Sequence, residues 1–177
     1  MSANRYVGIN RCLTEKLLIR NALMRDVPSI HRLITEYAEY NRMLFRSHAH
    51  LYEHLRDFSV AVEAMDGSDQ VVACAALELV WHDLAEIKSL AVDRRFQTRK
   101  IGASLVRAKL DEACRLGISR VFALTREPGF FQKLNFQIVP KDTLPHKVWT
   151  DCIHCPLQAE CDEVAMVIDL KTVGSQS

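Results

Sequence analysis

The sequence predicts a mixed α/β fold in which helices pack against a central sheet. Short apolar segments of strand composition recur along the chain, and the Asp66-Gly67 pair between two of them favours a hairpin turn. A strand, a long amphipathic helix and a further buried strand follow later in the sequence. Hairpins before a strand–helix–strand crossover are typical of a mixed α/β domain.

The N-terminal elements follow from local periodicity and helix-start signals. Residues 1–16 have no clear period and are predicted to form a loose arm, whereas residues 17–23 are predicted to form a strand. A helix is predicted to begin with Asp26 as its N-cap and Pro28 in its first turn. Its apolar stripe consists of Ile30, Leu33, Ile34, Tyr37 and Ala38. Residues 41–54 are rich in Arg and His and are expected to form a loop and a short helix.

The long helix of the crossover is predicted to end at Gly117. Its apolar stripe consists of Gly102, Val106, Leu110, Ala113 and Gly117, with Arg107, Asp111 and Arg115 on the opposite face. The other predicted elements are strands at 58–65, 71–81, 84–92, 120–125 and 163–170, and a short helix at 128–136. No internal repeat or low-complexity linker interrupts this order.

Composition limits the classes of function. The chain has 177 residues, 49% of them hydrophobic, which is enough for one sizeable core in a single domain. A net charge of +1 argues against electrostatic binding to nucleic acid or acidic membranes. No apolar run of about 18 residues and no signal-peptide core is present, so a cytoplasmic location is expected, with the six cysteines as thiols or metal ligands.

The stretch EIKSLAVDRRFQTRKIGA, from Glu86 to Ala103, is the most informative part of the chain. An apolar strand with one acid leads into a basic loop, and Gly102 lies in the first turn of the following helix. Backbone N–H groups at such a helix start bind phosphate. A carboxylate on the preceding strand is placed to accept a proton beside the anchored ligand. The pattern indicates an enzyme that holds a phosphorylated cofactor and deprotonates an amine.

These residues resemble the acetyl-coenzyme A motif of the GNAT N-acetyltransferase superfamily, whose signature is Gln/Arg-x-x-Gly-x-Gly/Ala. The resemblance implies a mostly antiparallel mixed sheet, splayed at the cofactor site and flanked by helices. It places a single domain at 17–170 and a tail at 171–177. The segments RVFALT, FFQKLNF and TLPHKVWTD are similar to the acetyltransferase domain of N-acetylglutamate synthases, here in a short form without an amino-acid-kinase domain.

The resemblance assigns a role to each matching position. Leu90, Ala91 and Val92 would pair their backbone with the pantetheine arm, and the Leu90 N–H would polarise the thioester carbonyl. Glu86 aligns with the carboxylate that serves as general base. The residues that would wrap the pyrophosphate of acetyl-CoA are Gln97, Thr98, Arg99, Lys100, Ile101, Gly102 and Ala103.

The chain departs from the family pattern at three positions. Lys100 stands where the signature has Gly, so a side chain there is expected to strain the turn or to meet the phosphates. Phe131 stands where many relatives have the Tyr that protonates the departing thiolate. Asn135 stands where relatives have Gly, and it tolerates the positive φ of such a turn.

Structural explanations for the same residues stay open at this point. The basic loop is alternatively a solvated surface, and Glu86 a structural acid paired with Lys88 on the same strand face. Cys152, Cys155 and Cys161 have the spacing of a structural zinc site, with His146, His154 or Asp162 as a fourth ligand. A second CxxC pair is missing, so incidental reduced cysteines are favoured.

The sequence therefore predicts an acetyl-CoA-dependent acyltransferase acting on the α-amine of a small amino acid. The resemblance favours L-glutamate, and thus the first step of arginine biosynthesis. Lys88, Arg126 and Lys147 are the cations expected to bind the acceptor's carboxylates. The alternatives are another amine acceptor (a peptide N-terminus, a polyamine or an antibiotic) and a regulatory domain that binds acetyl-CoA without turnover. A homodimer is a possible assembly.

Overall fold

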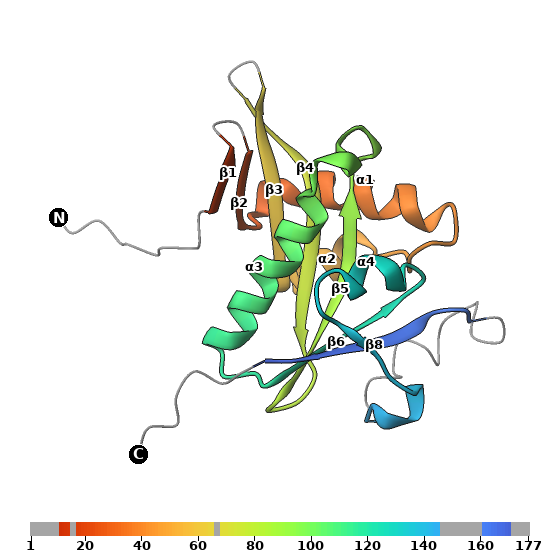
Figure 1. Ribbon diagram of the computed structural model, residues 1–177. Helices are drawn as coiled ribbons and strands as arrows, with labels where there is room; N and C mark the ends of the chain where they lie inside the picture. The colour runs from red at the N-terminus through yellow and green to blue at the C-terminus, as the bar shows by residue number, and fades with distance from the viewer. Residues whose placement is uncertain (1–10, 15–16, 66–67, 146–160, 171–177) are drawn as a thin grey trace. The chain divides into compact units, whose positions relative to one another are not determined.

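The computed structural model describes residues 11–14, 17–65, 68–145 and 161–170 (Figure 1). The chain divides into two compact units. The first comprises Met1–Ala76 and Ser89–Ala108, and the second comprises Leu77–Lys88 and Lys109–Ser177. Strands β4 (Ser68–Leu79) and β5 (Leu84–Val92) and helix α3 (Ile101–Arg115) contribute residues to both units.

The first unit contains four antiparallel strands in the order β1-β2-β3-β4. Strands β2 (Leu17–Asn21) and β3 (Phe58–Met65) lie where the sequence predicts them. Residues Arg11–Thr14, predicted to belong to a loose arm, instead form β1. This strand forms through backbone pairing with β2, which needs no hydrophobic period in the sequence.

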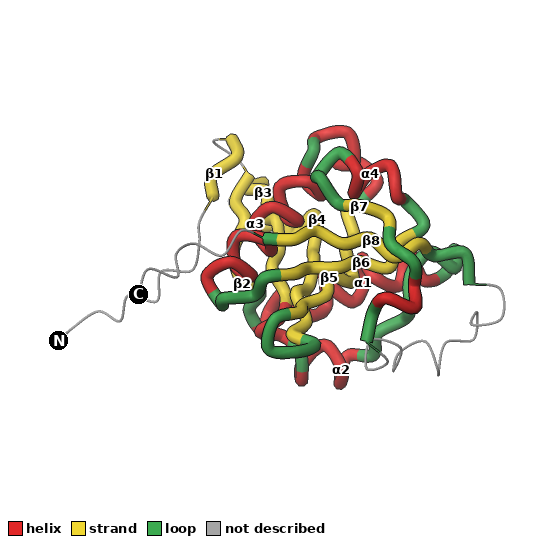
Figure 2. The backbone as a smooth tube through the Cα atoms, turned by 60° about the horizontal axis from the view of Figure 1, so that its bottom comes forward, coloured by secondary structure: helices red, strands yellow, loops and turns green. Residues whose placement is uncertain are grey.

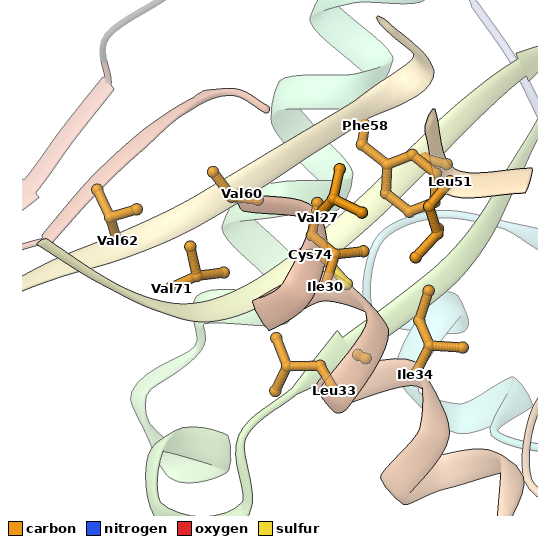
Figure 3. Packing of buried hydrophobic residues seen from close by; sticks show 12 residues of the cluster. Val27, Ile30, Leu33, Ile34, Leu51, Phe58, Val60, Val62, Val71 and Cys74 are labelled. Atoms are coloured by element: carbon orange, nitrogen blue, oxygen red, sulfur yellow. The ribbon is translucent and has the colours of Figure 1, made fainter. Parts of the chain in front are cut away.

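A β-bulge in β4 sets which residues face each side of the sheet in the first unit. The register passes from Ala61↔Ala73 to Val62↔Val71, so Val72 is an extra residue. On one face, Val60, Val62, Val71 and Cys74 pack with Val27, Ile30, Leu33 and Ile34 (Figure 3). On the other face, Ala61, Val72, Ala73 and Ala75 pack with Phe96, Ile101, Leu105 and Ala108. The alternation of β3 and β4 thus gives this sheet two buried faces.

Helix α1 (Val27–Ala38) provides the first of these covering layers. It begins after Asp26 with Pro28 in its first turn, as predicted, but the Asp26 carboxylate does not cap it. That carboxylate instead accepts hydrogen bonds from the Arg20 guanidinium, at 2.6 and 3.0 Å, and from the Leu23 N–H at 2.7 Å. Burial acts to raise the pKa of Asp26, and these hydrogen bonds outweigh it, so the pKa lies below its usual value.

The remaining elements of the first unit are short, apart from the start of α3. The 41–54 region contains one helix, as predicted, namely α2 (His48–Glu53), which Ser47 caps through the His50 N–H at 3.2 Å. The 3₁₀ turns are η1 (Met24–Asp26), η2 (Leu55–Asp57) and η3 (Arg94–Arg99). The buried residues at the start of α3 pack against the second face of the sheet.

In the second unit the strand order is β5-β6-β8-β7 (Figure 2). β5 and β6 (Arg120–Thr125) are parallel, which confirms the predicted crossover. β8 (Val164–Asp169) pairs antiparallel with β6 and with β7 (Gln137–Ile138). The other elements are α4 (Pro128–Gln132) and η4 (Lys141–Thr143). The core of this unit includes Val80, Leu84, Phe122, Leu144, Ala165 and Val167.

Helix α3 differs from its predicted stripe at two positions. Leu110 is only half-buried, and Lys109 has no exposed surface. The Lys109 ammonium lies 2.8 Å from the Glu112 carboxylate, one turn along the helix. An aliphatic stem with a paired head group allows a lysine to occupy a position that helical periodicity assigns to an apolar residue.

The structure confirms the predicted fold class, a mixed α/β fold with a mostly antiparallel sheet flanked by helices. A single domain over 17–170 stays a prediction, because the chain divides into two compact units. Within the described ranges, no helix has the length and apolar character needed to cross a lipid bilayer.

The Arg20–Asp26 pair is expected to stabilise the first unit. Asp26→Asn leaves the half-buried Arg20 without its charged partner, so the free energy of unfolding should fall by about 1.5–3 kcal/mol. Because the folded-state pKa of Asp26 is lowered, its contribution is present above the unfolded-state pKa and is lost as pH falls through the folded-state pKa. Urea unfolding between pH 7 and pH 2 measures both effects. Asp169→Asn, which breaks the exposed Arg120–Asp169 pair, is the control and should cost little. Equal losses in the two variants would contradict the prediction.

Candidate functional site

Strand β5 contains one left-handed residue just before the segment predicted to pair with a cofactor. Ser89 has a φ of +52°, a left-handed conformation that is uncommon for a non-glycine residue inside a strand. The Ser89 carbonyl accepts a hydrogen bond from the Cys74 thiol at 3.6 Å. Sequence reasoning missed both residues, because neither Gly nor Asn marks the turn. Leu90, Ala91 and Val92 therefore follow a local irregularity in the strand.

The Cys74 thiol is an inert partner for this irregularity. It is completely buried, and burial raises its pKa to about 12. A thiol with that pKa stays protonated at neutral pH and donates its hydrogen. Cys74 is thus a structural residue of the first unit rather than a nucleophile.

The loop after β5 is anchored at its first residue and near its middle. The Asp93 N–H donates to the Val72 carbonyl at 2.9 Å. Phe96 is buried in the cluster that joins the sheet of the first unit to the start of α3. The Asp93 carboxylate accepts from the Arg95 N–H at 3.1 Å and from the Arg95 guanidinium at 2.8 and 3.1 Å. These bonds from Arg95 hold the pKa of Asp93 below its usual value. The loop is a fixed structure rather than a string of solvated cations.

Two side chains predicted to wrap a pyrophosphate contact other parts of the first unit. The Gln97 amide donates to the Tyr37 hydroxyl at 2.8 Å, and the Arg99 guanidinium lies 2.6 Å from the Glu63 carboxylate. Arg94 stacks over the Tyr40 ring at 4.5 Å. The basic residues of the loop are therefore largely engaged with protein groups.

Lys100 is the exception in this loop. It has a φ of +58° and a ψ of +17°, directly before α3 begins at Ile101. This left-handed conformation explains why the motif favours Gly at this position. Lys100 is exposed and, among the residues that the structure describes, pairs with no acidic side chain. The structure thus places Lys100 directly before the first turn of α3, where Gly102 and Ala103 lie, and a basic residue at a helix start is suited to a phosphate.

The predicted base, Glu86, lies in the second unit together with two of the predicted acceptor-binding cations, Lys88 and Arg126. Glu86 is 9% exposed, and its carboxylate is 3.5 Å from the Lys88 ammonium. Lys88 also lies 2.5 Å from the Glu78 carboxylate. The burial of Glu86 agrees with a role as general base, and its pairing with Lys88 agrees with a role as a structural acid. Arg126 is paired with Asp162.

The two departures in the FFQKLNF segment have local structural reasons. Phe131 is buried and packs edge-to-face against Phe130 and Phe136, each with a centroid distance of 5.1 Å. Asn135 has a φ of +68°, which confirms that it keeps a turn that Gly would otherwise make. Phe131 thus contributes packing and carries no proton-donating group.

Several predicted residues lie outside the described part of the chain. These are Lys147, Cys152 and Cys155, together with His146 and His154. Cys161 is described, and its sulfur lies 3.6 Å from the Lys141 ammonium. Within the described ranges, no group of three His, Cys, Asp or Glu side chains is placed to hold a metal ion. The zinc site at the cysteine cluster therefore stays a prediction.

Comparison with known proteins gives consistent matches. Residues 24–136 match the model of the acetyltransferase (GNAT) family. An uncharacterized N-acetyltransferase of Chlorobaculum tepidum is 40% identical over 84% of this chain and 94% of its own length. An amino-acid acetyltransferase of Mycobacterium tuberculosis is 39% identical over 67% of each chain.

A similar solved structure is N-acetylglutamate synthase from Neisseria gonorrhoeae, complexed with coenzyme A and N-acetyl-glutamate. Its TM-score with this chain is 0.78 at 31% identity. The match covers 89% of this chain but only 36% of the synthase chain. The likeness therefore concerns one part of that larger protein.

The left-handed Lys100 generates a prediction about stability. Lys100→Gly should raise the free energy of unfolding by about 0.5–1 kcal/mol, because glycine adopts positive φ without a Cβ clash. Chemical denaturation measures the change. Lys133→Gly is the matched control, since Lys133 has a φ of −65° and gains nothing from glycine there. A Lys100→Gly variant that is less stable than the parent would show that the lysine side chain offsets its backbone strain.

Proposed function

The chain belongs to the GNAT acetyltransferase family, and we propose that it transfers acetyl from acetyl-CoA to the α-amine of a small amino acid, L-glutamate above others. The observation that carries the proposal is the loop that ends at the left-handed Lys100 and opens into α3. Its spacing after Leu90, Ala91 and Val92 matches the acetyl-CoA motif. The amino-acid acetyltransferase and N-acetylglutamate synthase among the similar proteins support this class of acceptor.

In this proposal the cofactor is held mainly by backbone groups. The N–H groups from Gln97 to Ala103 meet the pyrophosphate, with the exposed Lys100 ammonium as an additional positive charge. Gln97 and Arg99 shape the loop, because their side chains are bonded to Tyr37 and Glu63. The backbone of Leu90–Val92 pairs with the pantetheine arm, and the Leu90 N–H donates to the thioester oxygen.

The proposed chemistry needs one base and no covalent enzyme intermediate. The acceptor arrives as an ammonium and loses a proton to the Glu86 carboxylate, directly or through water. The free amine attacks the thioester carbonyl carbon and forms a C–N bond and a tetrahedral oxyanion. Collapse of the oxyanion breaks the C–S bond, and the coenzyme A thiolate leaves. The second proton of the amine then neutralises that thiolate, which requires no hydroxyl at Phe131.

The acceptor's carboxylates are proposed to bind cations that already have carboxylate partners. Lys88 contacts Glu78 and Glu86, and Arg126 contacts Asp162. An acidic acceptor must therefore share or replace these partners, so its affinity reflects an exchange of ion pairs. The same acidic side chains favour a second candidate function, acetylation of a cationic amine such as a polyamine.

The proposed base gives a kinetic prediction. Glu86→Gln should lower the rate of acetyl transfer by about 10²–10⁴-fold, because a positioned base contributes that much. The affinity for coenzyme A should be nearly unchanged. Steady-state kinetics and calorimetry measure the two quantities, with Glu53→Gln on the exposed surface of α2 as the control. Retention of the full rate by Glu86→Gln across the pH range would assign Glu86 a structural role.

The acceptor class gives a second prediction. Glutamate should be acetylated faster than glutamine, aspartate, lysine or spermidine at equal concentration. A well-placed charged hydrogen bond is worth about 1.5–3 kcal/mol, which corresponds to tenfold discrimination or more against a neutral analogue. Release of the coenzyme A thiol measures turnover with each compound. Preference for lysine or spermidine would replace the amino-acid proposal with the cationic-amine alternative, and no turnover despite coenzyme A binding would indicate a regulatory domain.

A further inference from the structure

The Tyr37 hydroxyl joins helix α1 to both parts of the proposed cofactor site. It donates a hydrogen bond to the Val92 carbonyl at 2.7 Å and accepts one from the Gln97 amide at 2.8 Å. Val92 is the last residue of β5, and Gln97 lies in the loop that precedes α3. All three residues belong to the first unit. One hydroxyl therefore connects the strand to the loop.

A second hydrogen bond holds the same peptide group from its other side. The Val92 carbonyl and the Asp93 N–H share one rigid plane. The Asp93 N–H donates to the Val72 carbonyl at 2.9 Å, so this plane is held by β4 on one side and by α1 on the other. Loss of either bond leaves a polar group without its partner and removes one of the two constraints on the orientation of this plane.

The other contacts between α1 and the loop constrain it less. Arg94 stacks over the Tyr40 ring at 4.5 Å, and the Arg32 guanidinium lies 3.9 Å from the Asp93 carboxylate. Arg32 and Arg94 are exposed, and exposed charge contacts contribute little. Tyr37 is half-buried, and its hydroxyl is bonded on both sides with defined donor and acceptor directions: the bond to Val92 is partly buried, whereas the bond from Gln97 is exposed.

We propose that Tyr37 is a positioning residue for coenzyme A binding, a role that rests on the proposed function. The hydrogen-bond chain from Gln97 through Tyr37 to Val92 sets the pyrophosphate loop at a fixed distance from the strand that pairs with the pantetheine arm. A site arranged before binding loses less entropy when the ligand arrives. Gln97 then acts through Tyr37, and its side chain does not touch the cofactor.

The first test removes only the hydroxyl. Tyr37→Phe keeps the ring, which packs against the buried cluster between α1 and the sheet of the first unit. Calorimetry should show coenzyme A binding weakened about two- to tenfold. The KM for acetyl-CoA should rise by the same factor while the KM for the acceptor stays constant. Tyr40→Phe is the matched control, because it loses a hydroxyl beside the same loop but keeps the ring under Arg94. It should bind coenzyme A as the parent does.

A double-mutant cycle tests the connection to Gln97. Gln97→Met should lower the affinity for coenzyme A about as much as Tyr37→Phe does. The double variant should have about the same affinity as the single variant that binds coenzyme A less tightly. Additive losses would show that Gln97 meets the cofactor independently and would overturn the proposal. A Tyr37→Phe variant with a lower melting temperature but unchanged coenzyme A affinity would also overturn it, by making Tyr37 purely structural.

The same measurements separate this inference from the proposed function. A parent protein that does not bind coenzyme A would contradict both the proposed function and the role of Tyr37. A parent that binds coenzyme A, with Tyr37→Phe and Tyr40→Phe both binding equally well, would remove only the role of Tyr37.

Discussion

The peptide group between Val92 and Asp93 is the constraint on which the candidate cofactor site depends. Its N–H is bonded to Val72, which is the extra residue of the bulge in β4. Its carbonyl is bonded to Tyr37 of α1. The bulge therefore has two consequences: it sets which residues of β4 face each helix, and it provides the acceptor that fixes the end of β5. A single register shift couples core packing to the position of the loop.

The charges of the candidate site are mostly used to hold the protein together. Arg95 is bonded to Asp93, and Arg99 is bonded to Glu63. This pairing is consistent with the near-neutral chain, whose net charge is +1. A phosphate that binds here meets fixed backbone N–H groups and the Lys100 ammonium, so affinity depends on arrangement more than on the number of cations.

Charged side chains are also paired within the protein in the second unit, where the acceptor is proposed to bind. Lys88 and Arg126 have carboxylate partners within the protein. Specificity for an acidic acceptor then arises from the difference between two sets of ion pairs. The sequence predicts the cations but not their carboxylate partners, and in the proposed site Glu78 competes with the acceptor's carboxylate for Lys88.

Local periodicity, spacing and backbone preference were enough to predict the order of the main elements, the crossover, the family motif and the turn at Asn135. The folded structure was needed to find the strands at Arg11–Thr14 and Gln137–Ile138, the irregularity at Ser89 and the burial of Lys109. It also revealed the bonds from Gln97 to Tyr37 and from Arg99 to Glu63. The physical reason is that each of these features, apart from the local backbone angle of Ser89, requires packing or a partner elsewhere in the fold. Hydrophobic periodicity contains no information on which distant side chain a polar group meets.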